Sequence, residues 1–320
     1  IQEGIQDYTD GSARVLTAVG CDLFRDRTEP LAEVQDRMAE AVAAAENSDV
    51  VILCPGLDET LEGEEGDTGN SYASGDKESL MLPEVQRQLM EAIAKTGKPV
   101  ILCLTAGSDI DLSFAAEHFD AVMVLWYPGA NGGSALAKVL FGDEEPGGKL
   151  PVTFYNSLSE LPDFSDYSMK GRTYRFMENE AQYPFGYGLT YGDIRVEQAE
   201  FICESDEEAG ISPRVNAVVK NDSGRTASDV IQVYVKNMDS PLAVPNPQLF
   251  GFKRITLETG EQAEVSILLP EDGFKVVNEE GERIFDGDRF EIFVGTSQPD
   301  RRSIALTGKV PVRVEVSLGR

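Results

Sequence analysis

Short apolar runs alternate with helical patterns along the first half of the chain. The runs that predict strands are Arg14–Val19, Val50–Cys54, Lys98–Leu104 and Ala121–Trp126. A helical spacing of apolar residues predicts helices over Leu31–Ala45, Pro83–Lys95, Ile110–Glu117 and Ser134–Phe141. Strands that are apolar throughout are buried on both faces, as in a parallel sheet covered by helices. The pattern therefore predicts a doubly wound α/β sandwich with a mostly parallel sheet over residues 1–154.

The pattern changes in the second half, where short runs alternate between apolar and polar positions. These runs are Val215–Val219, Val230–Val235, Phe252–Ile255, Glu264–Leu269 and Phe290–Val294. Turn signals such as Asn221–Gly224 and Thr259-Gly260 separate them. The regular spacing predicts an all-β sandwich of immunoglobulin or fibronectin type III kind over residues 194–320. No cluster of chemically active residues appears there, so we interpret this domain as a scaffold.

Residues 155–193 fit neither pattern. The stretch is rich in aromatic residues, namely Tyr155, Phe164, Tyr167, Tyr174, Phe176, Tyr183, Phe185, Tyr187 and Tyr191. It is too long for a slack linker inside a compact protein. We expect an ordered connecting segment that runs over the α/β sandwich and beside the β-sandwich, and we expect all of these aromatic side chains to be buried.

The charge balance narrows the classes of partner. The chain of 320 residues has 56 Asp and Glu against 28 Lys and Arg, a formal net charge of -28. Such a surface repels nucleic acid and anionic lipid, and no apolar run approaches the length of a membrane span. The four cysteines have no metal-ligand spacing. We therefore expect no nucleic acid, membrane or metal partner, and a reducing, cytoplasmic location.

Candidate chemistry is concentrated in an acidic stretch directly after the run Val50–Cys54. Its carboxylates are Asp58, Glu59, Glu62, Glu64, Glu65 and Asp67. Crowded carboxylates repel one another, so one of them can keep its proton near neutral pH and act as a general acid. The alternative interpretation is a solvated acidic loop in a very acidic protein.

Two more loops follow predicted strands and should share one edge of the sheet with the acidic stretch. They are residues 105–109 and 126–133. The Trp126-Tyr127 pair suits the apolar face of a sugar, and Asn131 suits its hydroxyl groups. Gly132-Gly133 opens a helix but no Lys-Ser/Thr follows, and GxGxxG is absent, so a nucleotide site in a flavodoxin-like domain is disfavoured.

A series of motifs resembles family 3 glycoside hydrolases of the β-xylosidase and β-glucosidase type. In chain order they are Gly56–Glu64, Gly75–Lys77, Leu80–Gln86, Trp126–Gly133, Leu140–Gly142, Pro146–Pro151, Arg172–Phe176, Tyr183–Tyr191 and Leu249–Arg254. Two departures stand out: Lys77 replaces the usual Arg, and about Asp67–Ser74 is an insertion. The resemblance extends over nearly the whole chain.

The resemblance implies a retaining exo-glycosidase that removes a β-linked sugar from the non-reducing end of an oligosaccharide or an aryl or alkyl β-glycoside. It implies Glu64 as the acid/base, with Glu62 and Glu65 left open because of the insertion, and substrate contacts at Asp58, Trp126 and Asn131. It also implies a (β/α)8 barrel that carries an Asp nucleophile. The elements predicted over residues 1–320 include no such barrel. We therefore expect the chain to be part of a larger enzyme and to be inactive alone.

The resemblance implies no cofactor. The sequence leaves the oligomeric state open, a homo-oligomer included. The competing class of function is a non-catalytic carbohydrate-binding or scaffold module.

Overall fold

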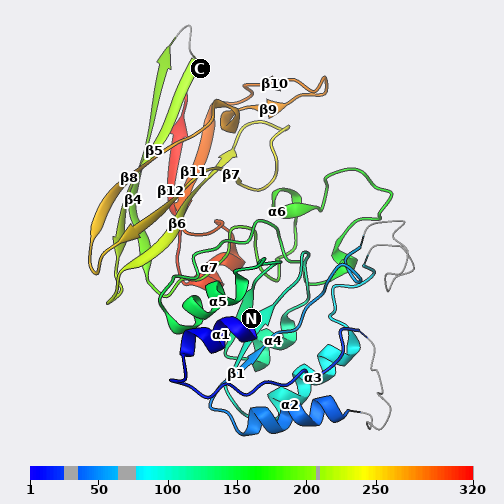
Figure 1. Ribbon diagram of the computed structural model, residues 1–320. Coiled ribbons are helices and arrows are strands. Elements are labelled where there is room, and N and C mark those ends of the chain that lie inside the picture. The colour runs from blue at the N-terminus through cyan, green and yellow to red at the C-terminus, as the bar shows by residue number, and fades with distance from the viewer. Residues whose placement is uncertain (25–34, 64–76, 207–209, 320) are drawn as a thin grey trace. The chain divides into compact units, whose positions relative to one another are not determined.

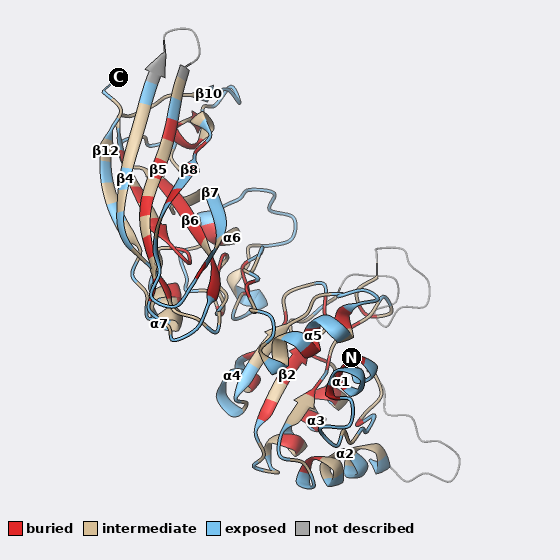
Figure 2. Cartoon of the chain, turned by 60° about the vertical axis from the view of Figure 1, so that its left-hand side comes forward, coloured by how far each residue is buried: buried red, intermediate tan, exposed pale blue. Residues whose placement is uncertain are grey.

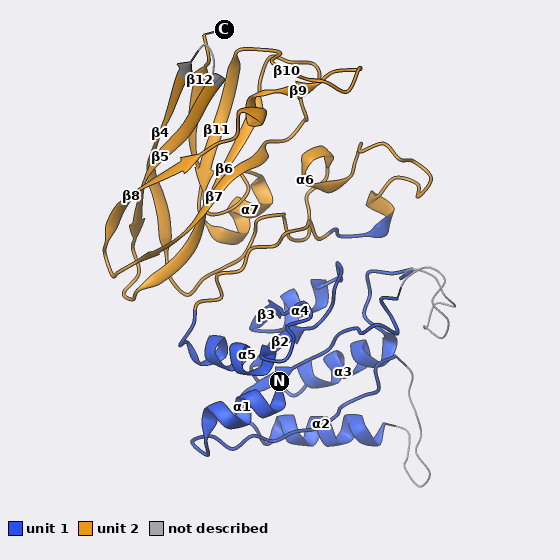
Figure 3. Ribbon diagram, turned by 45° about the horizontal axis from the view of Figure 1, so that its top comes forward, with its two compact units in different colours: residues 1–144, 155–158 blue, residues 145–154, 159–320 orange. Residues whose placement is uncertain are grey.

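The computed structural model describes residues 1–24, 35–63, 77–206 and 210–319. The chain forms two compact units (Figure 3). Unit 1 holds residues 1–144 with 155–158, and unit 2 holds residues 145–154 with 159–320. The predicted domain limits at residues 154 and 193 stay a prediction.

Unit 1 is built on a parallel sheet with the order β1-β2-β3. The strands are β1 (Val51–Leu53), β2 (Val100–Leu104) and β3 (Ala121–Val124). The helices are α1 (Gln2–Thr9), α2 (Asp36–Glu46), α3 (Glu84–Ala94), α4 (Ser113–His118) and α5 (Gly132–Phe141). Four of the five residues of β2 are buried, as expected for the central strand of a sheet covered by helices. The predicted α/β class with a parallel sheet is confirmed.

The helices of unit 1 pack in pairs, with α1 beside α5 and α2 beside α3 (Figure 1). The first pair approaches closely because both helices present glycine at the contact. A Cβ atom on Gly4 would lie 2.2 Å from the carbonyl carbon of Gly133. On α3, Leu89 and Ile93 are buried one turn apart, which is the spacing of a helix face turned to the core.

One predicted strand is wrong. Residues 14–20 form no strand, and β1 is left as an edge of the sheet. Val19 is 70% exposed, and the backbone turns at Gly20 with a φ of 81°. An apolar run becomes a strand only when its backbone pairs with a neighbour, and that pairing depends on contacts the local pattern does not encode. The predicted helix over Leu31–Ala45 begins outside the described residues, and its described part is α2.

Unit 2 is an all-β sandwich. One sheet has the order β12-β11-β6-β7 and the other β4-β5-β8, both antiparallel. The strands are β4 (Ile194–Asp206), β5 (Gly210–Asn221), β6 (Ala227–Asn237), β7 (Gln248–Leu257), β8 (Gln262–Leu268), β11 (Arg289–Gly295) and β12 (Val312–Ser317). The short hairpin strands are β9 (Val276–Val277) and β10 (Arg283–Ile284). The predicted immunoglobulin or fibronectin III-like class is confirmed.

The core of the sandwich lies between the two sheets, in red along the strands of Figure 2. Buried and exposed residues alternate along β8, so one face of the strand packs inward. Val215, Ile231 and Phe290 are central members of this core. Unit 2 also contains the short helices α6 (Thr173–Phe176), η2 (Glu271–Phe274) and α7 (Arg301–Thr307). The helical turn η1 (Leu158–Glu160) begins at the last residue of unit 1.

Much of the aromatic stretch packs against the β-sandwich inside unit 2. The ring of Tyr174 stacks on Phe185 with centroids 4.3 Å apart and meets the edge of Tyr234 at 6.3 Å. Its hydroxyl accepts a hydrogen bond from the backbone N–H of Leu249 at 3.1 Å. The expectation that every aromatic residue is buried is wrong, because Phe164 is 87% and Tyr167 is 91% exposed. Both lie in a stretch of polar turns outside the packed part.

Candidate functional site

The acidic loop begins where β1 ends and is held there from two sides. Gly56 forms a parallel bridge with Thr105, which follows β2. A Cβ atom at Gly56 would lie 2.0 Å from the Thr105 carbonyl oxygen, so only glycine fits. The buried side chain of Gln86 on α3 accepts from the Gly56 N–H at 2.8 Å and donates to the Gly56 carbonyl at 2.7 Å. The two loops therefore leave the sheet side by side.

Asp58 shapes the next turn of the loop. Its carboxylate oxygen Oδ1 accepts from the Thr60 N–H at 2.9 Å and from the Thr60 hydroxyl at 2.6 Å. Its carbonyl accepts from the N–H of Glu62 at 2.9 Å. Leu61, which is 2% exposed, anchors the turn in the core. This arrangement turns the chain back over the sheet edge and brings Glu62 toward the neighbouring loops.

Glu62 is the point at which the loops after β1, β2 and β3 meet. Its carboxylate accepts from the backbone N–H of Gly107 at 2.7 Å. The hydroxyl of Ser108 and the hydroxyl of Tyr127 also donate to it. A parallel sheet places the carboxyl ends of its strands at one edge, and the predicted meeting of these loops is seen at this carboxylate.

The surroundings of Glu62 favour its charged form. Burial acts to raise the pKa of Glu62, but the donors Ser108, Tyr127 and Gly107 and the charge of Lys77 outweigh it, and the net pKa is lowered. Burial and the Glu62 carboxylate raise the pKa of Tyr127. Glu62 is therefore a fixed anion near neutral pH, and Tyr127 stays a donor to it.

Lys77 and Asp109 lie close to this carboxylate and are joined to each other by a hydrogen bond. The Lys77 ammonium donates to the Ser108 hydroxyl at 2.6 Å and to the Asp109 carbonyl at 2.7 Å. Burial lowers the pKa of Lys77, while Glu62 and Asp109 act to raise it. Lys77, at the position where the resemblance leads us to expect Arg, places a positive charge close to the Glu62 carboxylate.

Asp109 is held by one hydrogen bond on its carboxyl group. Its Oδ2 accepts from the Tyr155 N–H at 2.7 Å, and its buried Oδ1 has no hydrogen-bond partner within the described residues. Burial raises the pKa of Asp109 to about 6. This carboxyl group therefore changes charge close to neutral pH.

The structure describes some of the predicted site residues and not others. Glu64 and Glu65 lie outside the described residues, as does the insertion over about Asp67–Ser74. Trp126 is half-buried just after β3, in a left-handed backbone conformation with a φ of 54°. Asn131 is exposed at the N-cap of α5, and no described hydrogen bond joins it to Glu62.

The sequence argument missed the partners of Glu62. Ser108 was noted only as a member of its loop, and Tyr127 only as the partner of Trp126 for the apolar face of a sugar. Each is nevertheless a hydroxyl-bearing residue placed shortly after a strand of the sheet. That position is the signal that points to them. Across the described ranges, no group of three or more His, Cys, Asp or Glu residues is placed to hold a metal ion, and no helix has the length and apolar character that crossing a bilayer needs.

Comparison with known families gives two matches. Residues 1–191 match the glycosyl hydrolase family 3 C-terminal domain, and residues 229–298 match a fibronectin type III-like domain.

Individual proteins resemble the chain over most of its length. A xylan 1,4-beta-xylosidase of Xylanibacter ruminicola is 38% identical over 270 residues, which is 84% of this chain and 31% of the relative. A beta-xylosidase of Formosa agariphila is 32% identical over 97% of this chain and 41% of its own length. The chain thus spans less than half the length of these relatives.

Solved structures give the same picture. A β-glucosidase from Erythrobacter marinus superimposes with a TM-score of 0.80 at 28% identity, over 98% of this chain and 42% of that one. A GH3 beta-glucosidase from Bifidobacterium adolescentis gives a TM-score of 0.79 at 28% identity, over 98% and 45%.

Proposed function

This chain belongs to glycosyl hydrolase family 3, and from that premise we propose that it is the C-terminal part of a retaining, exo-acting β-glycosidase. The enzyme would hydrolyse O-glycosyl bonds at non-reducing ends of β-xylosides or β-glucosides. The support is the family match over residues 1–191 together with relatives named as xylosidases and glucosidases. That the chain spans less than half of these relatives supports a further domain in the same gene product.

The observation that carries the proposal is the meeting of three loops at the Glu62 carboxylate. This contact holds Glu62, within the acidic stretch, at the carboxyl edge of the sheet, where ligands bind in open α/β folds. A general acid must carry a proton near the working pH. The lowered pKa of Glu62 disfavours it for that role. We therefore assign Glu62 as the anchor of the loop and keep Glu64 as the acid/base, with Glu65 as the other candidate.

The mechanism then needs two carboxylates on opposite sides of the scissile bond. Retaining glycosidases hold them roughly 5–5.5 Å apart. In our proposal a barrel domain supplies an Asp nucleophile that attacks the anomeric carbon, while Glu64 protonates the departing glycosidic oxygen. Glu64 then removes a proton from water, which attacks the glycosyl-enzyme and releases the sugar with its original configuration. Asp58, Trp126 and Asn131 would contact the substrate.

The test is hydrolysis of aryl β-xylosides and aryl β-glucosides by the complete gene product and by the 320-residue chain in parallel. We expect turnover by the complete protein, with a β-configured sugar as the first product seen by NMR, and only background hydrolysis by the chain. Robust turnover by the 320-residue chain alone would contradict the proposal that the nucleophile comes from another domain. Saccharide binding without turnover by the complete protein would favour the non-catalytic module.

A further inference from the structure

Two cysteines lie side by side near the carboxyl edge of the sheet, Cys54 directly after β1 and Cys103 as the next-to-last residue of β2. The register pairs Leu53 with Leu102, and the bridge farther along pairs Gly56 with Thr105. Both place Cys54 directly opposite Cys103. Residues paired in register on neighbouring strands point to the same face of the sheet. The two thiols are close enough for a hydrogen bond between them to shift both of their pKa values.

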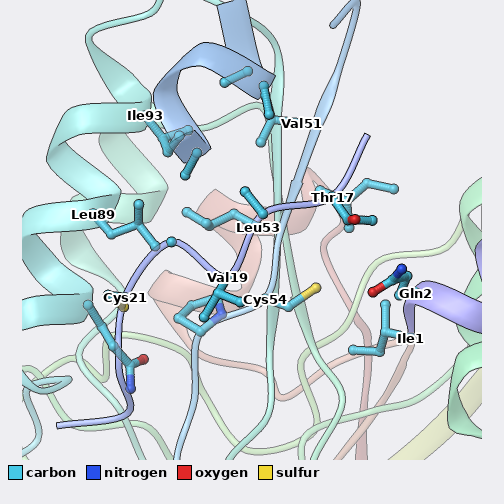
Figure 4. A pocket seen from close by; sticks show the side chains of 18 of the residues that line it. Ile1, Gln2, Thr17, Val19, Cys21, Val51, Leu53, Cys54, Leu89 and Ile93 are labelled. Atoms are coloured by element: carbon cyan, nitrogen blue, oxygen red, sulfur yellow. The ribbon is translucent and has the colours of Figure 1, made fainter. Parts of the chain in front are cut away.

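The two thiols differ in access. Cys54 is exposed, whereas Cys103 is completely buried. Cys54 lines a cavity of 570 Å³ in unit 1, a volume in the range of small-molecule sites. Figure 4 shows its sulfur turned toward Ile1 and Gln2, with Leu89 and Ile93 on the opposite side. A small molecule in the cavity can therefore reach Cys54 but not Cys103.

We propose that Cys54 and Cys103 form a thiol–disulfide exchange site, in which Cys54 attacks a small-molecule disulfide such as oxidised glutathione and Cys103 then closes a Cys54–Cys103 disulfide. Neighbouring strands lie about 4.7–4.9 Å apart, within the roughly 4.4–6.8 Å between Cα atoms that a disulfide spans. No backbone rearrangement is needed to bring the two residues within range.

The hydrogen bond between the thiols sets the order of the two steps. It lowers the pKa of Cys54, because the Cys103 S–H donates to the Cys54 thiolate. It raises the pKa of Cys103, together with burial and the charge of Cys54. The thiolate is the attacking species, so Cys54 reacts first. Once glutathione is attached to Cys54, the Cys54 thiolate is gone. Its hydrogen bond and its negative charge then no longer raise the pKa of Cys103, and only burial does.

The steps balance without another reagent. The Cys54 thiolate forms a bond to one sulfur of oxidised glutathione, and the S–S bond of glutathione breaks to release one glutathione thiolate. Cys103 then gives its proton to that thiolate and attacks the Cys54 sulfur, which releases the second glutathione. Two protein thiols are oxidised to one disulfide, and one oxidised glutathione is reduced to two thiols.

The test exposes the purified protein to oxidised glutathione, blocks the remaining thiols with an alkylating reagent, and digests it with trypsin without reduction. Each cysteine falls in a different tryptic peptide, with Cys54 in residues 38–77 and Cys103 in residues 96–138. We expect these two peptides joined by a disulfide, the free thiols to fall from four to two, and both changes to be reversed by dithiothreitol. This measurement is independent of glycosidase activity, so its outcome is separate from that of the proposed function.

Single variants separate the two roles. In Cys103→Ala the second step is blocked, and one glutathione should remain attached at Cys54. In Cys54→Ser neither the adduct nor the disulfide should form, because the attacking thiolate is absent. The amount of oxidised protein should fall at least about tenfold. Cys21→Ser is the matched control, since Cys21 lines the same cavity, and it should behave as the unchanged protein. A disulfide that involves Cys21, an adduct that persists in Cys54→Ser, or four unmodified thiols in the unchanged protein would overturn the proposal.

Discussion

The carboxylate of Glu62 accepts a hydrogen bond from the hydroxyl of Tyr127, a residue 65 positions later in the chain. The contact joins the loop after β1 to the loop after β3, and Ser108 adds the loop after β2. An anion held by several donors is a poor general acid but a good anchor. Glu62 therefore positions the acidic stretch, and we look for the proton donor among the carboxylates that follow it.

The first prediction assigns the acid/base in the complete enzyme. Glu64→Ala should slow substrates with poor leaving groups by roughly 10²–10⁴-fold, the usual contribution of acid–base catalysis. Activated aryl leaving groups need less protonation and should suffer less. Azide should restore the second step and give a β-glycosyl azide, detected by NMR. Glu62→Gln is the matched variant: if it alone shows the azide rescue, the assignment moves to Glu62.

The second prediction concerns the donor to Glu62. Tyr127→Phe removes one hydrogen bond and should lower the free energy of unfolding by about 0.5–1.5 kcal/mol at neutral pH. The folded-state pKa of Glu62 is lowered, so its stabilising contribution is present above its unfolded pKa and is lost as the pH falls through the folded one. The difference between variant and unchanged protein should therefore shrink below about pH 4. Urea unfolding at several pH values measures it.

The control for this variant is Tyr167→Phe, because Tyr167 is 91% exposed. It should change the free energy of unfolding by less than about 0.5 kcal/mol at every pH. An equal loss in both variants, or a loss at Tyr127 that does not depend on pH, would contradict the pairing with ionised Glu62.

The third prediction concerns Asp109, whose pKa of about 6 in the folded protein exceeds its unfolded value of about 3.9. Between these two pKa values the folded state binds more protons than the unfolded state. Asp109 therefore makes the free energy of unfolding fall as the pH rises from about 4 to above 6. Asp109→Asn keeps an acceptor for the Tyr155 N–H and removes the titration. The variant should gain on the order of 1 kcal/mol relative to the unchanged protein between pH 4 and pH 8, after allowance for solvent screening.

Denaturant unfolding of both proteins at closely spaced pH values measures this gain. Asp163→Asn is a suitable control, because the pKa of Asp163 is lowered by Ser165 and not raised. A constant difference between Asp109→Asn and the unchanged protein across the range would show that Asp109 does not titrate there.

The fourth prediction concerns the aromatic stretch. Tyr174→Ala removes a buried ring from between Phe185 and Tyr234 and should lower the free energy of unfolding by about 3–5 kcal/mol. Tyr167→Ala should cost less than about 0.5 kcal/mol, because that ring is exposed. Limited proteolysis reports the same contrast, with faster cleavage inside residues 155–191 in the first variant only. Rapid cleavage of the unchanged protein there, with two stable halves released, would show a flexible linker instead.

The sequence by itself determined the architecture, because the elements of both units are written in local patterns. The apolar runs Val50–Cys54, Lys98–Leu104 and Ala121–Trp126 correspond to β1, β2 and β3, and the alternating runs after residue 194 correspond to strands of the sandwich. A strand buried on both faces is apolar throughout, and a strand buried on one face alternates between apolar and polar residues, so each environment can be recognised in the sequence. The family motifs were also readable, since they are contiguous along the chain.

Only the tertiary structure decided which residues meet. The run Arg14–Val19 has a strand-like pattern but pairs with none of the described strands, and Phe164 is apolar but exposed. The contact of Glu62 with Ser108 and Tyr127, and the position of Cys54 opposite Cys103, follow from the order and register of β1, β2 and β3. Register is a relation between distant segments, and no local spacing of residues specifies it.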